Sequence, residues 1–213
     1  MSGLDFAVVS SRPEAHAAVP TLVLRLRIDE RDGQEVHAAA LNCQIRIEPQ
    51  RRRYLPEEEE SLYELFGETG QWGRSLKPFL WTHVSTTVGG FTASTEVDLP
   101  VACSYDLEVA GAKYLHGLEG GEIPLVLLFS GTVFTRGDSG FCAQPVGWDC
   151  EASYRLPVAT WRQVMDAYFP NSAWVRLRRD TFGALQAYKA RLAVPTFDQA
   201  FEQLLKEAGE EAP

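Results

Sequence analysis

Strict alternation of apolar and polar residues in two stretches near the N-terminus restricts the fold more than any other feature. In residues 21–28 (TLVLRLRI), the apolar positions are Leu22, Leu24, Leu26 and Ile28. In residues 36–48, the apolar positions are Leu41, Cys43, Ile45 and Ile47, and the polar ones are Asn42, Gln44, Arg46 and Glu48. A period of two is typical of a strand that buries one face. Because residues 31–34 (RDGQ) favour a turn, we predict that the two strands pair as a hairpin.

Further strand patterns follow after residue 78. We expect strands at residues 79–88, 94–99, 103–109, 125–134, 141–146 and 152–156. The string LVLLF at 125–129 is apolar on both faces, which is typical of a central strand. In all, about eight short strands predict an antiparallel β-sandwich or a partly open barrel.

Helical periodicity is found in two parts of the chain. Residues 56–66 begin with Pro56 and four glutamates and end before Gly67, which predicts a short helix inserted between strands. Residues 157–208 carry apolar residues at helical spacing, starting around Trp161. We expect Asp180 to cap a second helix of this segment and Thr196, with Gln199, to cap a third.

These patterns predict one α+β domain over residues 1–213. Residues 1–156 form its β-rich part, residues 157–208 form a helical segment packed on the sheet, and residues 209–213 form a flexible tail. A boundary near residue 157 is the alternative. It is disfavoured because a helical part of roughly fifty residues is marginal alone, and because no linker-like stretch precedes it.

The charge balance disfavours two classes of partner. The chain has 29 acidic and 20 basic residues and a net charge of −9, which repels nucleic acid and anionic membrane surfaces. No apolar run approaches the roughly 20 residues needed to span a bilayer. No basic stretch precedes an apolar one at the N-terminus, so we expect no signal peptide and a cytoplasmic location.

The cysteines and histidines lack the spacing of a catalytic or metal site. Cys43 and Cys103 fall at inward strand positions, and Cys142 and Cys150 do not form the paired spacing of a zinc site. The four histidines are scattered, and we expect His83, in an aromatic strand, to be buried and hydrogen-bonded. No nucleophile elbow or glycine-rich phosphate loop is present. The sequence therefore indicates no catalytic residue, no metal site and no cofactor.

Two arginine clusters stand out on this acidic chain. They comprise Arg51, Arg52 and Arg53, and Arg176, Arg178 and Arg179. One interpretation is solvated charge, with the first cluster paired to the glutamates at 57–60. The other is an anion-binding or partner-binding site where the two clusters meet, because arginine binds carboxylates with two parallel hydrogen bonds.

Several long strings of the sequence resemble a known family. They include CQIRIEPQRRRY (43–54), PFLWTHVS (78–85), STEVDLP (94–100) and YFPNSAWVRLRRDT (168–181), and the resemblance extends over nearly the whole chain. Together they are similar to an uncharacterised actinobacterial family, a domain of unknown function. The resemblance implies an association with gene clusters for nickel–iron uptake hydrogenases and implies no catalytic or ligand residues.

Two functions are compatible with this resemblance. The first is a non-catalytic accessory, assembly or binding protein whose partner is a hydrogenase subunit or maturation factor. The second is an enzyme or metal carrier of the same pathway that uses cysteine and histidine residues gathered by the fold. Because no catalytic spacing is present, the sequence favours the first.

Overall fold

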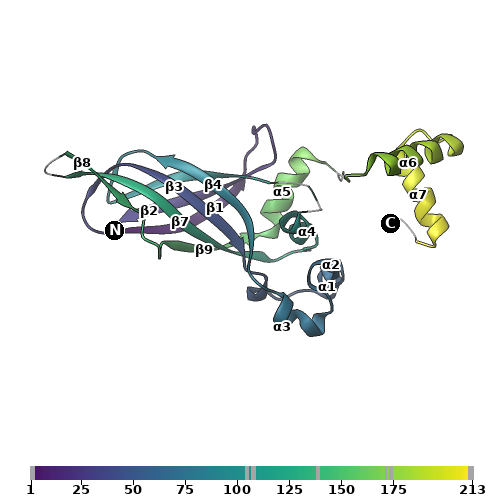
Figure 1. Cartoon of the computed structure of the whole chain (residues 1–213), viewed down its shortest axis with the longest axis horizontal. Coiled ribbons are helices and arrows are strands. Elements are labelled where there is room, and N and C mark those ends of the chain that lie inside the picture. The colour runs from purple at the N-terminus through teal and green to yellow at the C-terminus, as the bar shows by residue number, and fades with distance from the viewer. Residues whose placement is uncertain are drawn as a thin grey trace. The chain divides into compact units, whose positions relative to one another are not determined.

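The β-rich part of the chain forms two antiparallel sheets (Figure 1). In this computed structural model the described residues are 3–103, 106, 109–137, 140–170, 172 and 175–210. They belong to two compact units, Met1–Trp174 and Val175–Pro213. The first unit contains every described strand, and the second contains the last two helices.

The smaller sheet has three strands in the order β1-β2-β6. Their bounds are Leu4–Pro13 for β1, Thr21–Glu30 for β2 and Ser94–Ala102 for β6. The four alternating apolar residues of β2, from Leu22 to Ile28, are completely buried. The inward face expected from their period of two is therefore confirmed.

The larger sheet has six strands and is centred on β7. Its order is β4-β3-β7-β8, with β5 paired to β3 and β9 paired to β7. The bounds are Glu35–Ile47 for β3, Phe79–Val88 for β4, Phe91–Thr92 for β5, Glu122–Gly137 for β7, Gly140–Pro145 for β8 and Glu151–Pro157 for β9. Because β7 has neighbours on both edges, the central strand expected at LVLLF is confirmed.

The two sheets pack face to face as a sandwich and do not close into a barrel. Phe6 of β1 stacks on Phe129 of β7 with ring centroids 4.1 Å apart. At another point between the sheets, the Tyr154 hydroxyl of β9 donates a hydrogen bond of 2.9 Å to Ser11 Oγ of β1. The fold is therefore an α+β sandwich, one of the two architectures expected from the sequence.

The hairpin predicted for the first two strand patterns is wrong. β2 pairs with β1 and β6, whereas β3 pairs with β4, β5 and β7 in the other sheet. The chain thus crosses between layers at residues 31–34. Alternation predicts which face of a strand is buried. It does not predict whether the next strand of the chain pairs with it in the same sheet or lies in the facing sheet, because both arrangements bury the same face.

At Val109 and at Glu48 the structure differs from what the sequence patterns predicted. The strand predicted at 103–109 falls mainly on residues 104, 105, 107 and 108, which lie outside the described residues. Cys103 is buried as expected, but Val109 is exposed and directly precedes helix α4, Ala110–His116. Glu48, expected to point outward, is buried just after the end of β3.

Short helical turns link β3 to β4. Their bounds are Pro49–Arg51 for the 3-10 turn η1, Pro56–Ser61 for α1, Tyr63–Phe66 for α2, Thr69–Gln71 for the 3-10 turn η2 and Trp72–Ser75 for α3. The single helix expected at 56–66 is thus divided at Leu62, a completely buried residue with non-helical backbone angles. Pro56 begins the first piece, and Gly67, with a φ of 71°, ends the second, as expected.

The C-terminal segment contains three helices, α5 at Val158–Tyr168, α6 at Arg179–Leu192 and α7 at Phe197–Ala208. Helix α5 belongs to the first unit and packs on β1, β2 and β9. Thr196 caps α7 by accepting a hydrogen bond from the Gln199 N–H. Asp180 does not cap α6, because the helix begins one residue earlier, with Arg178 as the capping residue. None of the described helices has the length and apolar composition to span a membrane.

The single domain expected from the sequence stays a prediction. Of the tail expected at 209–213, Gly209 ends α7, and residues 211–213 lie outside the described residues.

Candidate functional site

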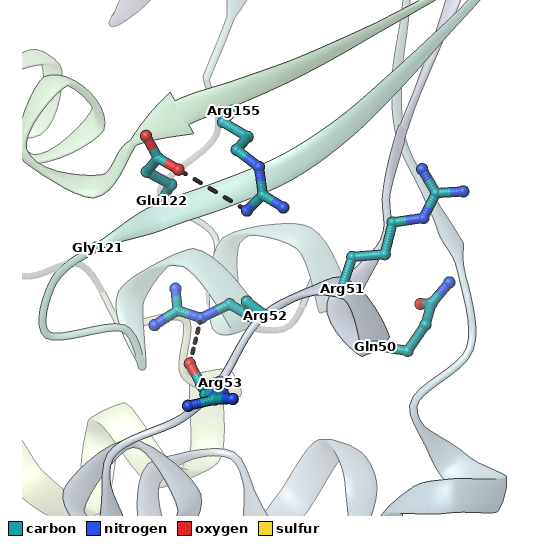
Figure 2. Close-up of a pocket in the computed structure, with 7 residues that line it drawn as sticks. All are labelled: Gln50, Arg51, Arg52, Arg53, Gly121, Glu122 and Arg155. Atoms are coloured by element: carbon teal, nitrogen blue, oxygen red, sulfur yellow. Dashed lines mark hydrogen bonds and ion pairs between the residues drawn. The ribbon is translucent and has the colours of Figure 1, made fainter.

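A cavity of about 690 Å³ lies where β3 ends, beside the start of β7 and the end of β9. It is lined by Gln50, Arg51, Arg52, Arg53, Gly121, Glu122 and Arg155. Figure 2 shows these side chains, and we call the hollow the arginine cavity. Three of the six arginines singled out from the sequence line it, and Arg155 joins them.

Local backbone structure explains how neighbouring arginines come to lie on this one surface. Pro49 starts the single turn of η1, and the chain then becomes extended at Arg52. Arg155 comes from β9, where it pairs with Pro124 of β7. Because β9 and the end of β3 both border β7, the tertiary fold brings Arg155 to a cluster about a hundred positions earlier in the chain.

The Arg52 side chain is buried and bound within the protein. Its Nη2 donates to both carboxylate oxygens of Glu58, at 2.7 and 2.8 Å, and to the Gly120 carbonyl oxygen at 3.2 Å. Its Nε donates to the Arg53 carbonyl oxygen. Its Nη1 is buried and has no hydrogen-bond partner among the described residues. Arg52 is therefore a structural member of the cavity wall with one guanidinium nitrogen unused.

Glu58 connects helix α1 to the loop before β7. Its carboxylate accepts hydrogen bonds from the N–H groups of Leu55 at 3.0 Å and Glu119 at 2.8 Å, in addition to the Arg52 pair. Burial alone would raise the pKa of Glu58. The two backbone donors and the Arg52 charge outweigh that effect and lower the pKa. The carboxylate is thus held in its charged form, in an internal pair with the guanidinium.

A hydrogen-bonded tyrosine pair supports the same wall. The Tyr54 hydroxyl donates to the Pro49 carbonyl oxygen at 2.7 Å and lies 2.9 Å from the Tyr114 hydroxyl. Since a hydroxyl has one hydrogen, Tyr114 is the donor to Tyr54. The Arg52 guanidinium lies over the Tyr54 ring, 4.9 Å from its centroid. Burial raises the pKa of Tyr114 to about 12, so it remains protonated at neutral pH.

The remaining arginines of the cavity are more available than Arg52. Arg51 pairs with Glu48 at 3.2 Å, and Arg155 pairs with Glu122 at 3.7 Å, a loose contact between exposed groups. Arg53 is exposed and has no ion pair within the described part of the chain. The Arg155–Glu122 pair joins two exposed side chains and contributes little stability, so Arg155 can exchange Glu122 for another carboxylate. Arg51 is itself exposed, although its partner Glu48 is buried.

The second arginine cluster belongs to the second unit. Arg176, Arg178 and Arg179 are exposed there, at and just before the start of α6. The meeting of the two clusters, which the sequence suggested as one interpretation, stays a prediction.

The cysteines and histidines do not form a reactive cluster in the described residues. Cys43 and Cys103 are buried, and desolvation raises the pKa of each thiol to about 12. His83 was expected to be buried, but it is exposed on the outward face of β4. No set of three histidine, cysteine, aspartate or glutamate residues in the described ranges is placed to hold a metal ion.

No pattern in the sequence identified Arg155 or Glu58 as residues of the candidate site. Arg155 stands alone between strand residues, and Glu58 is one of four consecutive glutamates. The sequence suggested that the first arginine cluster pairs with the glutamates at 57–60. The structure shows one such pair, Arg52–Glu58.

The whole sequence, residues 1–213, matches the model of a family of unknown function, DUF6084. The chain belongs to this family. No curated protein matches it. Membership in DUF6084 agrees with the uncharacterised domain that the sequence strings resemble.

Similarity of the DUF6084 chain to solved structures is weak. A beta-glucosidase from Kluyveromyces marxianus is 4% identical with a TM-score of 0.27, and the match covers 72% of this chain and 15% of that one. A putative late embryogenesis abundant protein is 12% identical with a TM-score of 0.32, covering 72% and 71%. AggA, the major subunit of aggregative adherence fimbriae type I from Escherichia coli, is 7% identical with a TM-score of 0.26, covering 73% and 95%. Scores this low do not indicate a shared fold.

Proposed function

We propose that this chain is a non-catalytic accessory protein that binds an acidic segment of a protein partner in the arginine cavity. The observation that carries the proposal is the lining of the cavity, where four arginines stand beside a single acidic residue, Glu122. The chain as a whole has a net charge of −9. Glu48 and Glu58, the partners of Arg51 and Arg52, lie just outside the lining, so four arginines face three glutamates and one positive charge remains in excess. A positive patch on an acidic protein favours an acidic partner.

The chemistry of arginine favours carboxylates as the ligand. A guanidinium presents parallel N–H donors that match the two oxygens of a carboxylate, and such pairs are stronger than neutral hydrogen bonds. A nucleic acid carries a charge on every phosphate along its length and meets the acidic surface beyond the cavity. A short acidic protein segment brings its carboxylates to the arginines alone, so it fits better than nucleic acid.

The arginines of the cavity have different roles in this proposal. Arg51, Arg53 and Arg155 are exposed and contact the partner, whereas Arg52 holds the wall through Glu58. Arg176, Arg178 and Arg179 provide a second set of contacts to the same partner. Charge reversal at Arg52 would disturb folding, so Arg52 is unsuitable as a probe of binding.

The family resemblance provides the identity of the partner in this proposal. We place the protein in the cytoplasm with a subunit or maturation factor of a nickel–iron hydrogenase as its partner. A binding protein of this kind needs a surface and no catalytic group.

The test is a quantitative pull-down with the full-length chain from cells that express the hydrogenase. The probe is the double variant Arg53→Glu/Arg155→Glu, and the control is Arg74→Glu, an exposed arginine of α3 outside the cavity lining. We expect the wild type and the control to retain a hydrogenase protein and the double variant to lose it, with all three melting at similar temperatures. Retention should also fall with salt, since exposed charges are screened beyond about 8 Å at physiological ionic strength.

Two results would contradict the proposal. Equal retention of the same partner by the double variant would place the contact elsewhere. Stoichiometric nickel or zinc in the purified chain would instead favour the metal-carrier function.

A further inference from the structure

Helices α6 and α7 form a hairpin with almost no interior of its own. Within the described residues 175–210, Ala200 is the one buried residue. Large apolar side chains of this unit are exposed, namely Val175, Leu177, Phe182, Phe201 and Leu205. Each helix therefore has an apolar side that the other helix covers incompletely.

Three phenylalanine rings form a continuous row across the two helices. The centroid of Phe197 lies 5.5 Å from that of Phe182 in α6 and 6.5 Å from that of Phe201 in α7. Phe182 is 41% and Phe201 is 38% exposed, and Leu205, one turn beyond Phe201, is 43% exposed. We call Phe182, Phe197, Phe201 and Leu205 the aromatic row.

A hairpin this small does not stabilise itself. Segments shorter than about 40 residues usually require disulfides, metals or association with another surface, because too little apolar area is buried. The four cysteines of the chain all precede residue 175, and Gly183 weakens α6. Burial of large apolar side chains is the main favourable contribution to folding and association, so covering the aromatic row is the available source of stability.

The charges on the two helices indicate what covers the row. Helix α6 has three basic residues and one acidic residue, a net charge of +2. Helix α7 has one basic and three acidic residues, a net charge of −2. Lys189 lies over the Phe197 ring, and Asp198 and Glu202 are exposed on α7 beside the row. A surface with positive charge on one side of an apolar row and negative charge on the other is complementary to a copy of itself related by a two-fold axis.

We propose that the aromatic row is a homodimer interface in which α6 and α7 of two copies form a four-helix bundle. In this arrangement α6 of one copy lies against α7 of the other, so that opposite charges flank the buried rings. The inference goes beyond the proposed function, since the arginine cavity lies in the first unit and does not depend on it.

The first test is the oligomeric state of the full-length chain, measured by sedimentation over a range of concentrations. We expect a dimer for the wild type. Phe201→Glu should raise the dissociation constant by at least about 30-fold, as for a buried aromatic hot spot. The control is Gln199→Glu, which adds the same charge at an exposed position on the polar side of α7 and should leave the dimer unchanged.

The second test uses the charge pattern to identify the partner helix. Arg179→Glu/Lys189→Glu makes both helices of the hairpin acidic, and Asp198→Lys/Glu202→Lys makes both basic. Neither double variant should dimerise alone. An equimolar mixture should form a heterodimer, because each α6 then meets an α7 of opposite charge in the other chain.

Three results would overturn the proposal. A wild type that stays monomeric at all concentrations would mean that the row is covered within one chain or not at all. A dimer that Phe201→Glu leaves intact would place the interface elsewhere. A mixture of the two charge variants that remains monomeric, while circular dichroism shows the hairpin helices in both, would rule out the pairing of α6 with α7.

Discussion

Arg52 and Glu58 form a buried ion pair in which one guanidinium nitrogen, Nη2, lies 2.7 and 2.8 Å from the two carboxylate oxygens. The Glu58 side chain is completely buried, and that of Arg52 is 7% exposed. Since Glu58 also binds the Glu119 N–H, the pair ties the turns after β3 to the loop before β7, on both sides of the arginine cavity.

Removing one member of this pair should destabilise the protein strongly. Arg52→Met leaves the Glu58 charge buried without its cation, and breaking a buried pair in this way costs ~3–5 kcal/mol of unfolding free energy. Arg155→Met, which breaks a pair between two exposed side chains, should cost less than about 1 kcal/mol. Chemical denaturation of both variants measures the difference, and equal costs would contradict the structural role of Arg52.

The pair should also make stability depend on pH. The pKa of Glu58 is lower in the folded protein than the value of about 4.3 in an unfolded chain. Its contribution is therefore present above about pH 4.3 and is lost as the pH falls through the folded pKa. The stability difference between wild type and Glu58→Gln should be large at pH 7 and smaller at about pH 3. A difference that is independent of pH would show that the carboxylate charge does not contribute.

The four thiols should react at different rates in the native protein. Cys142 is exposed and should be labelled first, whereas Cys43 and Cys103 are buried with pKa values of about 12 and should not be labelled. Cys150 is partly buried, and burial and the Asp149 charge raise its pKa, so it should react slowly. Mass spectrometry after a short exposure to a maleimide identifies the labelled sites. Early labelling of Cys43 would contradict the inward face of β3.

Trp161 is expected to be a major contributor to the packing of α5. It is 3% exposed on a helix that packs against β1, β2 and β9, so Trp161→Ala should cost ~3–5 kcal/mol. Trp148, at 87% exposed, provides a matched control, and Trp148→Ala should change stability by less than about 0.5 kcal/mol. Thermal denaturation compares the two, and similar midpoints would mean that α5 is not part of the core.

Truncation should separate α5 from the helices that follow it. A chain ending at residue 174 keeps nearly all the buried apolar residues and should melt within about 3 °C of the full chain, a stability change of roughly 1 kcal/mol. A chain ending at residue 157 loses Val158, Trp161, Val164 and Met165 from the core and should fail to melt cooperatively. If both truncated chains behave alike, the division into these two units is wrong.

Local patterns in the sequence were sufficient to predict much of the fold. The inward residues of β2 and β3, the burial of Trp161 and the Thr196 cap all follow from the spacing of residues within one strand or helix. The candidate site was predicted in part, because the first arginine cluster is contiguous and does line the cavity.

Contacts between distant segments decided the rest. Periodicity is a property of one segment, whereas strand partners depend on loop paths and on the packing of whole layers, so the sequence suggested a hairpin where the chain changes sheets. For the same reason the sequence did not reveal Glu58 as a site residue. It is one of four consecutive glutamates, and only the fold buries it against Arg52. Arg155 enters the cavity only because β9 pairs with β7. The sequence alone determined which faces of β2 and β3 are apolar and where α1 and α7 begin, and the tertiary structure determined which charges are buried, paired or left available for a partner.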